Sequence, residues 1–297
     1  MGLTAEGIIP AMVTPLGEDE ELDEEGMRQL INFLIEAGVH GVFVCGSQGE
    51  SYALKEDEKK LTIRTCIDEV NGRVPVYAGT GATTTRETID LSKYAGDVGA
   101  DAVSVVTPYF IKPSQSELYE HYRRIAEAVE IPVVLYNNPG RTGVNLEVET
   151  VRRLAETGNI VGVKDSSGDL TLTAEYIRSC PSGFSVLAGR DSLILATLVY
   201  GGKGAVAATA NVAPELVVGI YESYMRGELD RARQLQFKLL PLRLAFGFGT
   251  FPVVVKEAMK LLGRPAGPPR SPVTPLSEEN REKLRLILAD LGLPSPQ

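Results

Sequence analysis

Short apolar segments alternate with longer amphipathic segments along most of this chain. Most of the short segments are rich in Val, Ile or Ala and are followed by Gly, Thr or Asn. Eight of them are present, at residues 8–13, 42–45, 74–78, 102–106, 132–136, 160–163, 184–188 and 204–207. Segments this short favour strands over helices. Because they are continuously apolar, we expect them to be buried on both faces, as in parallel sheets covered by helices.

The segments between these runs have the spacing of amphipathic helices. In residues 24–37 the apolar side chains lie mainly three or four positions apart, and Val148, Val151 and Leu154 follow the same rule. Ser114 precedes Glu117 by three residues, which is the spacing of a capping box at a helix start. Eight strand–helix units predict an α/β fold, a closed (β/α)₈ TIM barrel over residues 1–226.

An open, doubly wound sheet is the competing architecture. It usually has fewer strands and carries a G-x-G-x-x-G motif after the first one. Here the first apolar segment ends in Thr14-Pro15-Leu16. The barrel is therefore favoured.

The remainder of the chain, residues 227–297, has no further strand pattern. It predicts helices at residues 230–240, 252–262 and 277–291, with a proline-rich bend at 264–269 before the last. No flexible linker precedes it. We expect a C-terminal all-helical appendage that packs on the barrel.

The amino-acid composition argues against several classes of function. Of the 297 residues, 43% are hydrophobic and 23% charged, which is ordinary for a soluble globular protein, and the net charge of −9 argues against nucleic acid or an anionic membrane as partner. The three cysteines, Cys45, Cys66 and Cys180, have no C-x-x-C spacing, and the two histidines have no ligand-type neighbours. We expect no metal, no disulfide, no membrane span and a cytoplasmic location.

Lys164 is the most informative residue of the chain. It follows the apolar run 160–163 and precedes the turn-like segment 165–169, so the lysine stands at the tip of a buried strand. Burial disfavours the ammonium form, and lowering a lysine pKa to the ~7–8 useful in catalysis takes about three units, or roughly 4 kcal/mol. A neutral amine attacks carbonyl groups. The alternative is a lysine that extends past the strand end into water.

In such barrels the reactive groups stand at the carboxyl ends of the strands. This rule places Lys164, Tyr136 and Ser47 at one cavity, where the Tyr136 phenol could exchange protons with groups on the lysine nitrogen. The amides of residues 46–49 could hold a carboxylate. Arg141 could bind a second carboxylate or could form a surface ion pair.

Three segments together resemble the dihydrodipicolinate synthase / N-acetylneuraminate lyase family. They are Gly46-Ser47-Gln48-Gly49-Glu50, the segment from Tyr136 to Gly143, and Gly162-Val163-Lys164-Asp165. The resemblance runs over nearly the whole chain. It implies a pyruvate-dependent class I aldolase or lyase on a (β/α)₈ barrel, usually a homotetramer, that needs no cofactor because Lys164 forms a Schiff base with pyruvate.

The resemblance also implies roles for the other candidate residues. Tyr136 would be the proton relay, and Ser47, Gln48 and Gly49 would belong to the loop that holds the pyruvate carboxylate. Arg141 would bind the carboxylate of aspartate semialdehyde, as in the synthases. The remaining substrate-binding candidates are Phe110, Arg190 and Val206.

Three positions depart from the synthase pattern. Gln48 stands where a second hydroxyl residue is usual, and Phe110 stands where a tyrosine completes a proton relay across a subunit interface. Arg190 replaces an acid and adds positive charge near the mouth of the cavity. A longer anionic substrate such as a 2-keto-3-deoxy sugar acid would suit Arg190 and Gln48.

Three hypotheses for function remain at this point. The first is a 4-hydroxy-tetrahydrodipicolinate (dihydrodipicolinate) synthase that condenses pyruvate with aspartate semialdehyde in lysine biosynthesis. The second is a 2-keto-3-deoxy sugar-acid (gluconate-type) aldolase or dehydratase that uses the same lysine. The third is a non-catalytic ligand-sensing barrel. For the enzymes we expect pyruvate and an aldehyde as small-molecule partners, and a homo-oligomer, tetramer or dimer.

Overall fold

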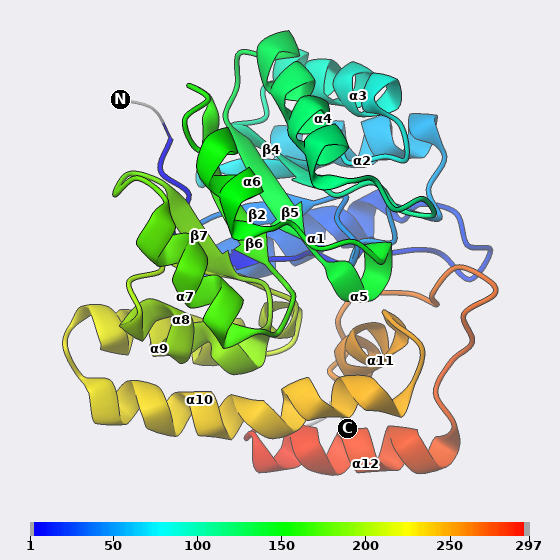
Figure 1. Cartoon of the computed structure of the whole chain (residues 1–297). Coiled ribbons are helices and arrows are strands. Elements are labelled where there is room, and N and C mark those ends of the chain that lie inside the picture. The colour runs from blue at the N-terminus through cyan, green and yellow to red at the C-terminus, as the bar shows by residue number, and fades with distance from the viewer. Residues whose placement is uncertain (1–2, 294–297) are drawn as a thin grey trace.

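The computed structural model describes residues 3–293, and within them eight parallel strands form one sheet (Figure 1). Each strand corresponds to one of the eight predicted apolar segments. The strands are β1 (Gly7–Pro10), β2 (Val42–Val44), β3 (Val76–Gly79), β4 (Ala102–Val106), β5 (Val133–Asn137), β6 (Ile160–Asp165), β7 (Ser185–Ala188) and β8 (Gly204–Ala207).

Strand pairing closes the sheet into a barrel. The order is β1-β8-β7-β6-β5-β4-β3-β2, so every neighbour pair in the ladder is consecutive along the chain except β1 with β8. The remaining gap is bridged in parallel between Ala11 and Phe43. Because each crossover carries a helix, the predicted TIM-barrel fold is confirmed.

Helices cover the outside of the barrel. The chain places α1 (Glu24–Glu36), α2 (Glu56–Val70), α3 (Thr85–Asp97), α4 (Gln115–Ala128), α6 (Val148–Leu154), α7 (Leu170–Ser179), α8 (Ile194–Val199) and α9 (Pro214–Met225) between and after the strands. Polar side chains cap the starts of helices: the Asp23 side chain accepts from Gly26 N at 2.8 Å, and Ser114 with Glu117 forms the expected capping box. A short helix that was not predicted, α5 (Pro139–Thr142), follows β5.

The tail consists of α10 (Leu229–Leu244), α11 (Val253–Leu261) and α12 (Glu278–Asp290), as expected for residues 227–297. Figure 1 shows α10 and α12 lying side by side below the barrel, with α9 next to α10. The prediction ended the first tail helix at residue 240, but α10 continues through Pro241, because Leu239 and Leu242 on either side of it are fully buried. Packing therefore overrides the local preference of proline. The division of the chain at residue 226 stays a prediction.

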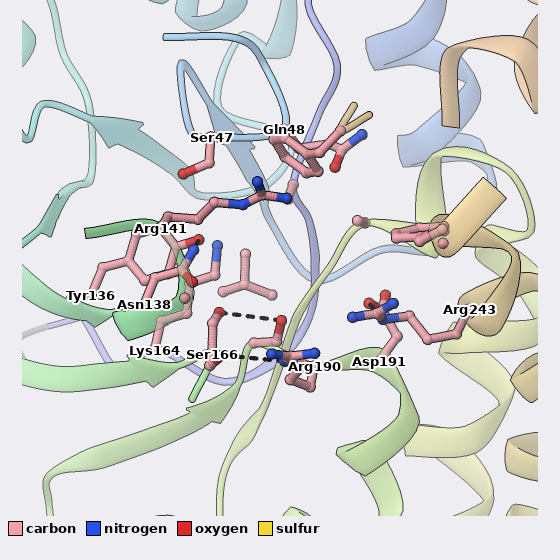
Figure 2. A pocket seen from close by; sticks show the side chains of 18 of the residues that line it. Ser47, Gln48, Tyr136, Asn138, Arg141, Lys164, Ser166, Arg190, Asp191 and Arg243 are labelled. Carbon is pink, nitrogen blue, oxygen red and sulfur yellow. Dashed lines mark hydrogen bonds and ion pairs between the residues drawn. The ribbon is translucent and has the colours of Figure 1, made fainter. Parts of the chain in front are cut away.

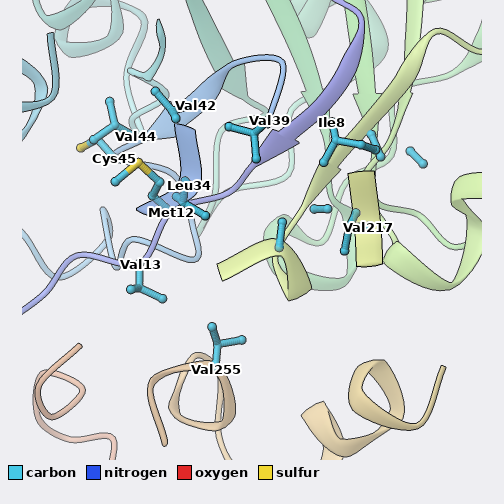
Figure 3. Packing of buried hydrophobic residues seen from close by; sticks show 14 of the residues in the cluster. Ile8, Met12, Val13, Leu34, Val39, Val42, Val44, Cys45, Val217 and Val255 are labelled. Atoms are coloured by element: carbon cyan, nitrogen blue, oxygen red, sulfur yellow. The ribbon is translucent and has the colours of Figure 1, made fainter. Parts of the chain in front are cut away.

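The apolar core has two layers. Side chains such as Ile9, Phe43 and Leu187 fill the barrel interior, and a larger cluster lies between the strands and the helices. Figure 3 shows part of the outer cluster, in which Val255 of α11 points toward Val13. The tail thus adds to the barrel core and does not form a separate one.

Within residues 3–293, no single helix is long and apolar enough to cross a membrane. Only Leu229–Phe248 and Val253–Leu261, taken together across a bend of 119°, reach that length and composition.

Candidate active site

A cavity of about 490 Å³ opens at the carboxyl ends of the strands, between the barrel and the tail. Its wall comes from both parts of the chain: Ala11, Ser47, Gln48, Tyr136, Asn138, Gly140, Arg141, Lys164, Ser166, Gly189, Arg190, Asp191, Val206, Ala208, Arg243, Phe246, Gly247, Gly249, Thr250 and Phe251. Figure 2 shows Tyr136, Asn138 and Lys164 on one side and Asp191 with Arg243 on the other. The position agrees with the usual place of active sites in this architecture.

Lys164 lies at the bottom of the cavity with only 4% of its surface exposed. On β6 it pairs in register with Tyr136 of β5, and its Nζ lies 3.9 Å from the centre of the Tyr136 ring and 4.6 Å from that of Phe43. Burial lowers the pKa of Lys164, against the opposing effects of Tyr136 and Asp191. The side chain therefore does not extend into solvent, and its neutral, nucleophilic form is reached at a lower pH than that of an exposed lysine.

Tyr136 is buried beside this amine. Burial alone would raise its pKa, but the Lys164 charge and hydrogen bonds from Ser47, Ser166 and Asn138 together hold the pKa of Tyr136 below its ordinary value. The Asn138 Nδ2 donates to the phenol oxygen at 2.9 Å. A phenol in these surroundings can both give and take a proton close to Lys164 Nζ.

The loop after β2 brings Ser47 and Gln48 to the wall of the cavity. Gln48 is 3% exposed, and among the described residues neither its Oε1 nor its Nε2 has a hydrogen-bond partner. A buried amide with no partner is costly, so a ligand in the cavity is the natural partner. Gly49 does not line the cavity: its carbonyl accepts from Thr14 Oγ1 at 2.6 Å, and a Cβ there would lie 3.0 Å from Met12 O. Gly49 thus lets the loop pack closely against the segment that follows β1.

The same loop is tied to the tail by a buried ion pair. Glu50, which has a left-handed backbone (φ 57°), places its Oε1 2.5 Å from the Nζ of Lys256 on α11, and Lys256 is fully buried. Lys256 also donates to Pro268 O at 2.8 Å, and Glu50 Oε2 accepts from Arg270 N at 2.8 Å. Together these contacts fix the end of the Ser47–Gln48 loop from outside the barrel.

Three arginines line the outer part of the cavity. Arg141, in α5, lies with its guanidinium carbon 4.4 Å from the centre of the Phe251 ring. Arg190 donates from Nε to Ser166 O at 3.2 Å, and Arg243 of α10 lies 3.4 Å from an Asp191 carboxylate oxygen. The wall is therefore cationic and suited to an anionic ligand.

The structure brings most predicted site residues together. Lys164, Tyr136 and Ser47 line the cavity as a group, and the substrate-binding candidates Gln48, Arg141, Arg190 and Val206 line it as well. Phe110 is different: it is 97% exposed and does not line the cavity. Its backbone is left-handed (φ 73°), which turns the side chain out of the loop after β4.

Several lining residues were not predicted from the sequence, and four of them have side chains that bear on the chemistry of the site. Asn138 lies in the segment from Tyr136 to Gly143, and Ser166 lies in the turn after Lys164, so attention to every polar residue next to a strand end could have found both. Arg243 and Phe251 come from the tail, and no local pattern connects them to the strand ends. Within residues 3–293, no group of three or more His, Cys, Asp or Glu side chains is placed to hold a metal ion.

Comparisons with known proteins point to one family. The model of the dihydrodipicolinate synthetase family matches residues 4–291. A protein of Methanopyrus kandleri named 4-hydroxy-tetrahydrodipicolinate synthase is 48% identical over 295 residues, which cover 99% of this chain and 98% of that protein. A second relative with the same name, from Methanothrix thermoacetophila, is 42% identical over 96% of this chain and 97% of its own length.

Solved structures agree with these relatives. A chloride-inhibited dihydrodipicolinate synthase from Acinetobacter baumannii, complexed with pyruvate, superposes with a TM-score of 0.95 at 39% identity, covering 98% of this chain and 100% of that one. The dihydrodipicolinate synthase from Aquifex aeolicus gives a TM-score of 0.95 at 38% identity, again over 98% and 100% of the two chains.

Proposed function

This chain belongs to the dihydrodipicolinate synthetase family, and on that premise we propose that it is a 4-hydroxy-tetrahydrodipicolinate synthase, a Schiff-base lyase that condenses pyruvate with aspartate semialdehyde. The observation that carries the proposal is the buried Lys164 amine, which lies over the ring of Tyr136 in a cavity of suitable size. The names of the relatives and the pyruvate held by the Acinetobacter baumannii enzyme support it.

The first step joins the lysine to pyruvate. The neutral Lys164 Nζ adds to the keto carbon, and the carbonyl oxygen takes a proton from the Tyr136 phenol. A second proton moves from the Lys164 nitrogen to the hydroxyl, which leaves as water. The protonated imine that results withdraws electrons from C3. Loss of a C3 proton to the Tyr136 phenolate leaves an enamine, and the phenol is restored.

The second step forms the carbon–carbon bond. The enamine C3 attacks the aldehyde carbon of aspartate semialdehyde, and the aldehyde oxygen takes a proton from Tyr136 to become a hydroxyl. The ammonium group of the semialdehyde gives a proton to the Tyr136 phenolate, and the resulting amine attacks the imine carbon and closes the ring. A second proton moves from this nitrogen to the Lys164 nitrogen, the bond between Lys164 and the carbon breaks, and Lys164 leaves as the amine while the ring keeps a carbon–nitrogen double bond. No metal or external cofactor is needed, because the imine itself is the electron sink.

Two groups of residues hold the substrates. Ser47 and Gln48 bind the pyruvate carboxylate with a hydroxyl and an amide, which provides the unpartnered Gln48 side chain with a ligand. Arg141 binds the carboxylate of the semialdehyde at the mouth of the cavity, and its stacking on Phe251 holds the guanidinium in place.

A 2-keto-3-deoxy sugar-acid aldolase or dehydratase is the second candidate. Arg190 and Arg243 favour it, because they add two donors on the wall away from Arg141, where a hydroxylated tail would lie. Both candidates use Lys164 and pyruvate chemistry, so they differ only in the second substrate.

The lysine is tested first. Incubation with pyruvate and borohydride reduces an imine to a stable adduct, and peptide mass analysis locates it. We expect the adduct on Lys164. An adduct on another lysine, or none, contradicts both enzymatic candidates and favours a ligand-sensing barrel.

The second substrate is tested by turnover. We expect kcat/KM with pyruvate and aspartate semialdehyde to exceed kcat/KM for cleavage of 2-keto-3-deoxygluconate by at least about tenfold, or about 1.4 kcal/mol in transition-state binding. The reverse order would assign the chain to the sugar-acid aldolases.

We also propose that the protein works in the cytoplasm as a homo-oligomer, a tetramer or dimer. The fully exposed Phe110 and the half-exposed Ile111 next to it support self-association, because adjacent exposed apolar side chains are typical of interfaces. Analytical ultracentrifugation gives the mass in solution, and a monomer at micromolar concentration would contradict the proposal.

A further inference from the structure

The phenol of Tyr136 has polar neighbours from two loops of its own chain. Asn138, in the segment after β5, donates from Nδ2 to the phenol oxygen at 2.9 Å. Ser166, in the segment after β6, is 6% exposed, lines the same cavity and donates from Oγ to Gly189 O at 3.2 Å. Figure 2 shows both side chains next to Tyr136 and Lys164.

The two neighbours differ in what they can do. An amide NH₂ group can only donate, so Asn138 stabilises the phenolate and cannot remove the phenol proton. A hydroxyl both donates and accepts. While Ser166 donates to Gly189 O, its lone pairs are free to accept from a neutral phenol, and rotation of its hydrogen lets it donate to the phenolate instead.

Within the described chain, residue 110 provides no hydrogen bond to the Tyr136 phenol. Phe110 has no hydroxyl, and its exposed side chain lies outside the cavity. The polar contacts of the phenol come from residues that follow β5 and β6, and from the Ser47 loop.

We propose that Asn138 and Ser166 are positioning residues that hold Tyr136 ready for proton transfer within a single chain. Asn138 stabilises the phenolate that removes the C3 proton of bound pyruvate, and Ser166 orients the phenol once that proton has arrived. The proposal rests on the proton-transfer role of Tyr136 in the proposed function. It does not depend on the identity of the second substrate.

The test follows the C3 proton alone. The protein is incubated with saturating pyruvate in D₂O, and the loss of methyl protons from pyruvate is followed by NMR across a range of pH. Exchange requires the Schiff base and a phenolate, so its rate rises with pH as Tyr136 ionises. Borohydride trapping, measured in parallel, reports whether Lys164 still binds pyruvate.

Asn138→Leu removes the donor from the phenolate. We expect the pH at which exchange rises to move upward by about one unit, and the rate at neutral pH to fall about tenfold, while trapping at Lys164 persists. Asn138→Asp is the second variant. Its carboxylate has nearly the same size, cannot donate and repels the phenolate, so the shift should have the same direction and be at least as large.

Ser166→Ala removes the hydroxyl, and Ser167→Ala is its matched control. Ser167 is the next residue, but its Oγ donates to Asp165 at 3.0 Å and it does not line the cavity. We expect Ser166→Ala to lower the exchange rate about tenfold or more. With Ser167→Ala, the exchange rate should rise at the same pH as in the wild-type protein. Ser166→Thr, which keeps a hydroxyl, should restore most of the lost rate.

The outcomes separate this inference from the proposed function. If the Asn138 variants and Ser166→Ala trap pyruvate and exchange with the wild-type rate and pH profile, the positioning role is wrong while the Schiff-base chemistry stands. If the wild-type protein forms no adduct at Lys164, the proposed function fails and the inference fails with it.

Discussion

Lys164 has its chemistry set by its neighbours and not by its own structure. Two aromatic rings and the barrel wall exclude water from its amine, and burial lowers its pKa. A lysine whose folded pKa lies below its unfolded value binds fewer protons in the folded state, so it lowers stability at neutral pH. This cost disappears only as the pH rises above the ordinary lysine value of about 10.4.

The first prediction concerns this cost. Lys164→Met should abolish pyruvate trapping and yet raise the free energy of unfolding by about 1 kcal/mol at pH 7, because a buried cation is replaced by an apolar side chain of similar length. Urea denaturation measures the change. Lys93, which is exposed on α3, provides the control: Lys93→Met should change the free energy by less than about 0.5 kcal/mol. A destabilised Lys164→Met would contradict the argument.

A second prediction follows from the same pKa direction. The rate of Schiff-base formation should fall as the pH is lowered through the depressed pKa of Lys164, and it should stay measurable at a pH where an exposed lysine is almost fully protonated. Rapid trapping at a series of pH values gives this profile. A profile that falls only near the ordinary lysine pKa would show that the amine is not desolvated in solution.

The third prediction concerns Arg141. Arg141→Ala should lower kcat/KM for aspartate semialdehyde by about 100-fold, because the substrate carboxylate loses a charged partner. The loss with an aldehyde that has no carboxylate should be within about threefold. Arg141→Lys keeps the positive charge but lacks the planar guanidinium. Its kcat/KM for aspartate semialdehyde should lie between those of the wild-type protein and Arg141→Ala. Equal losses for both aldehydes would rule out carboxylate binding by this residue.

At the scale of elements, neighbouring strands bring Lys164 and Tyr136 together, and helix α11 holds the loop that carries Ser47 and Gln48. The register of β5 and β6 pairs Tyr136 with Lys164, and a slip of one residue would turn one of them out of the cavity. Lys256 of α11 reaches Glu50 through a fully buried ion pair. The loop that carries Ser47 and Gln48 is thus fixed from the tail.

The fourth prediction tests the ion pair between Lys256 and Glu50. Lys256→Met leaves the Glu50 carboxylate buried without its cation, so the protein should lose about 3–5 kcal/mol of stability. KM for pyruvate should rise while kcat changes less, because the loop that binds the carboxylate loosens but Lys164 and Tyr136 stay in place. The double variant Glu50→Gln with Lys256→Met should recover much of the stability. An unchanged KM for pyruvate in a folded Lys256→Met protein would show that the ion pair does not affect substrate binding.

At the scale of the whole molecule, the barrel and the tail share one site. Arg243 and Phe251 of the tail line the cavity, and the Gln236 amide of α10 donates to Asp191 O at 2.9 Å. Val255 also belongs to the outer core of the barrel. The tail is therefore a structural part of the site and of the core.

The fifth prediction follows from this shared site. A chain shortened to residues 1–226 should fail to fold cooperatively, because Glu50 and Asp191 lose their cationic partners and the apolar surface under α11 is exposed. Circular dichroism during heating measures cooperativity. A stable shortened chain that still traps pyruvate would show that residues 227–297 form an independent domain.

The order of strands and helices was predictable because apolar periodicity is local. Each of the eight apolar segments contains its own strand signal, and caps such as Asp23 and Ser114 mark helix starts within a few residues. The end of α10 was not predictable in this way, since burial of Leu242 beyond Pro241 depends on distant elements.

The candidate site was predictable in part. Lys164, Tyr136 and Ser47 could be grouped because the carboxyl ends of parallel strands meet on one face. Phe110 is exposed and does not line the cavity of its own chain. Its expected place is across a subunit interface, so its role in substrate binding stays a prediction. Arg243 could not be found, since a charged residue on an amphipathic helix has no sequence signal that distinguishes a cavity wall from solvent.

The sequence by itself determined the barrel, the lysine at the tip of its sixth strand and the tyrosine on its fifth, because these follow from hydrophobic spacing over a few residues. Tertiary structure alone decided how far Lys164 is desolvated, which side chains surround the Tyr136 phenol, and that the tail closes the cavity. These properties depend on contacts between residues far apart in the chain. A pKa or a cavity wall is set by all neighbours in space, and only folding brings them together.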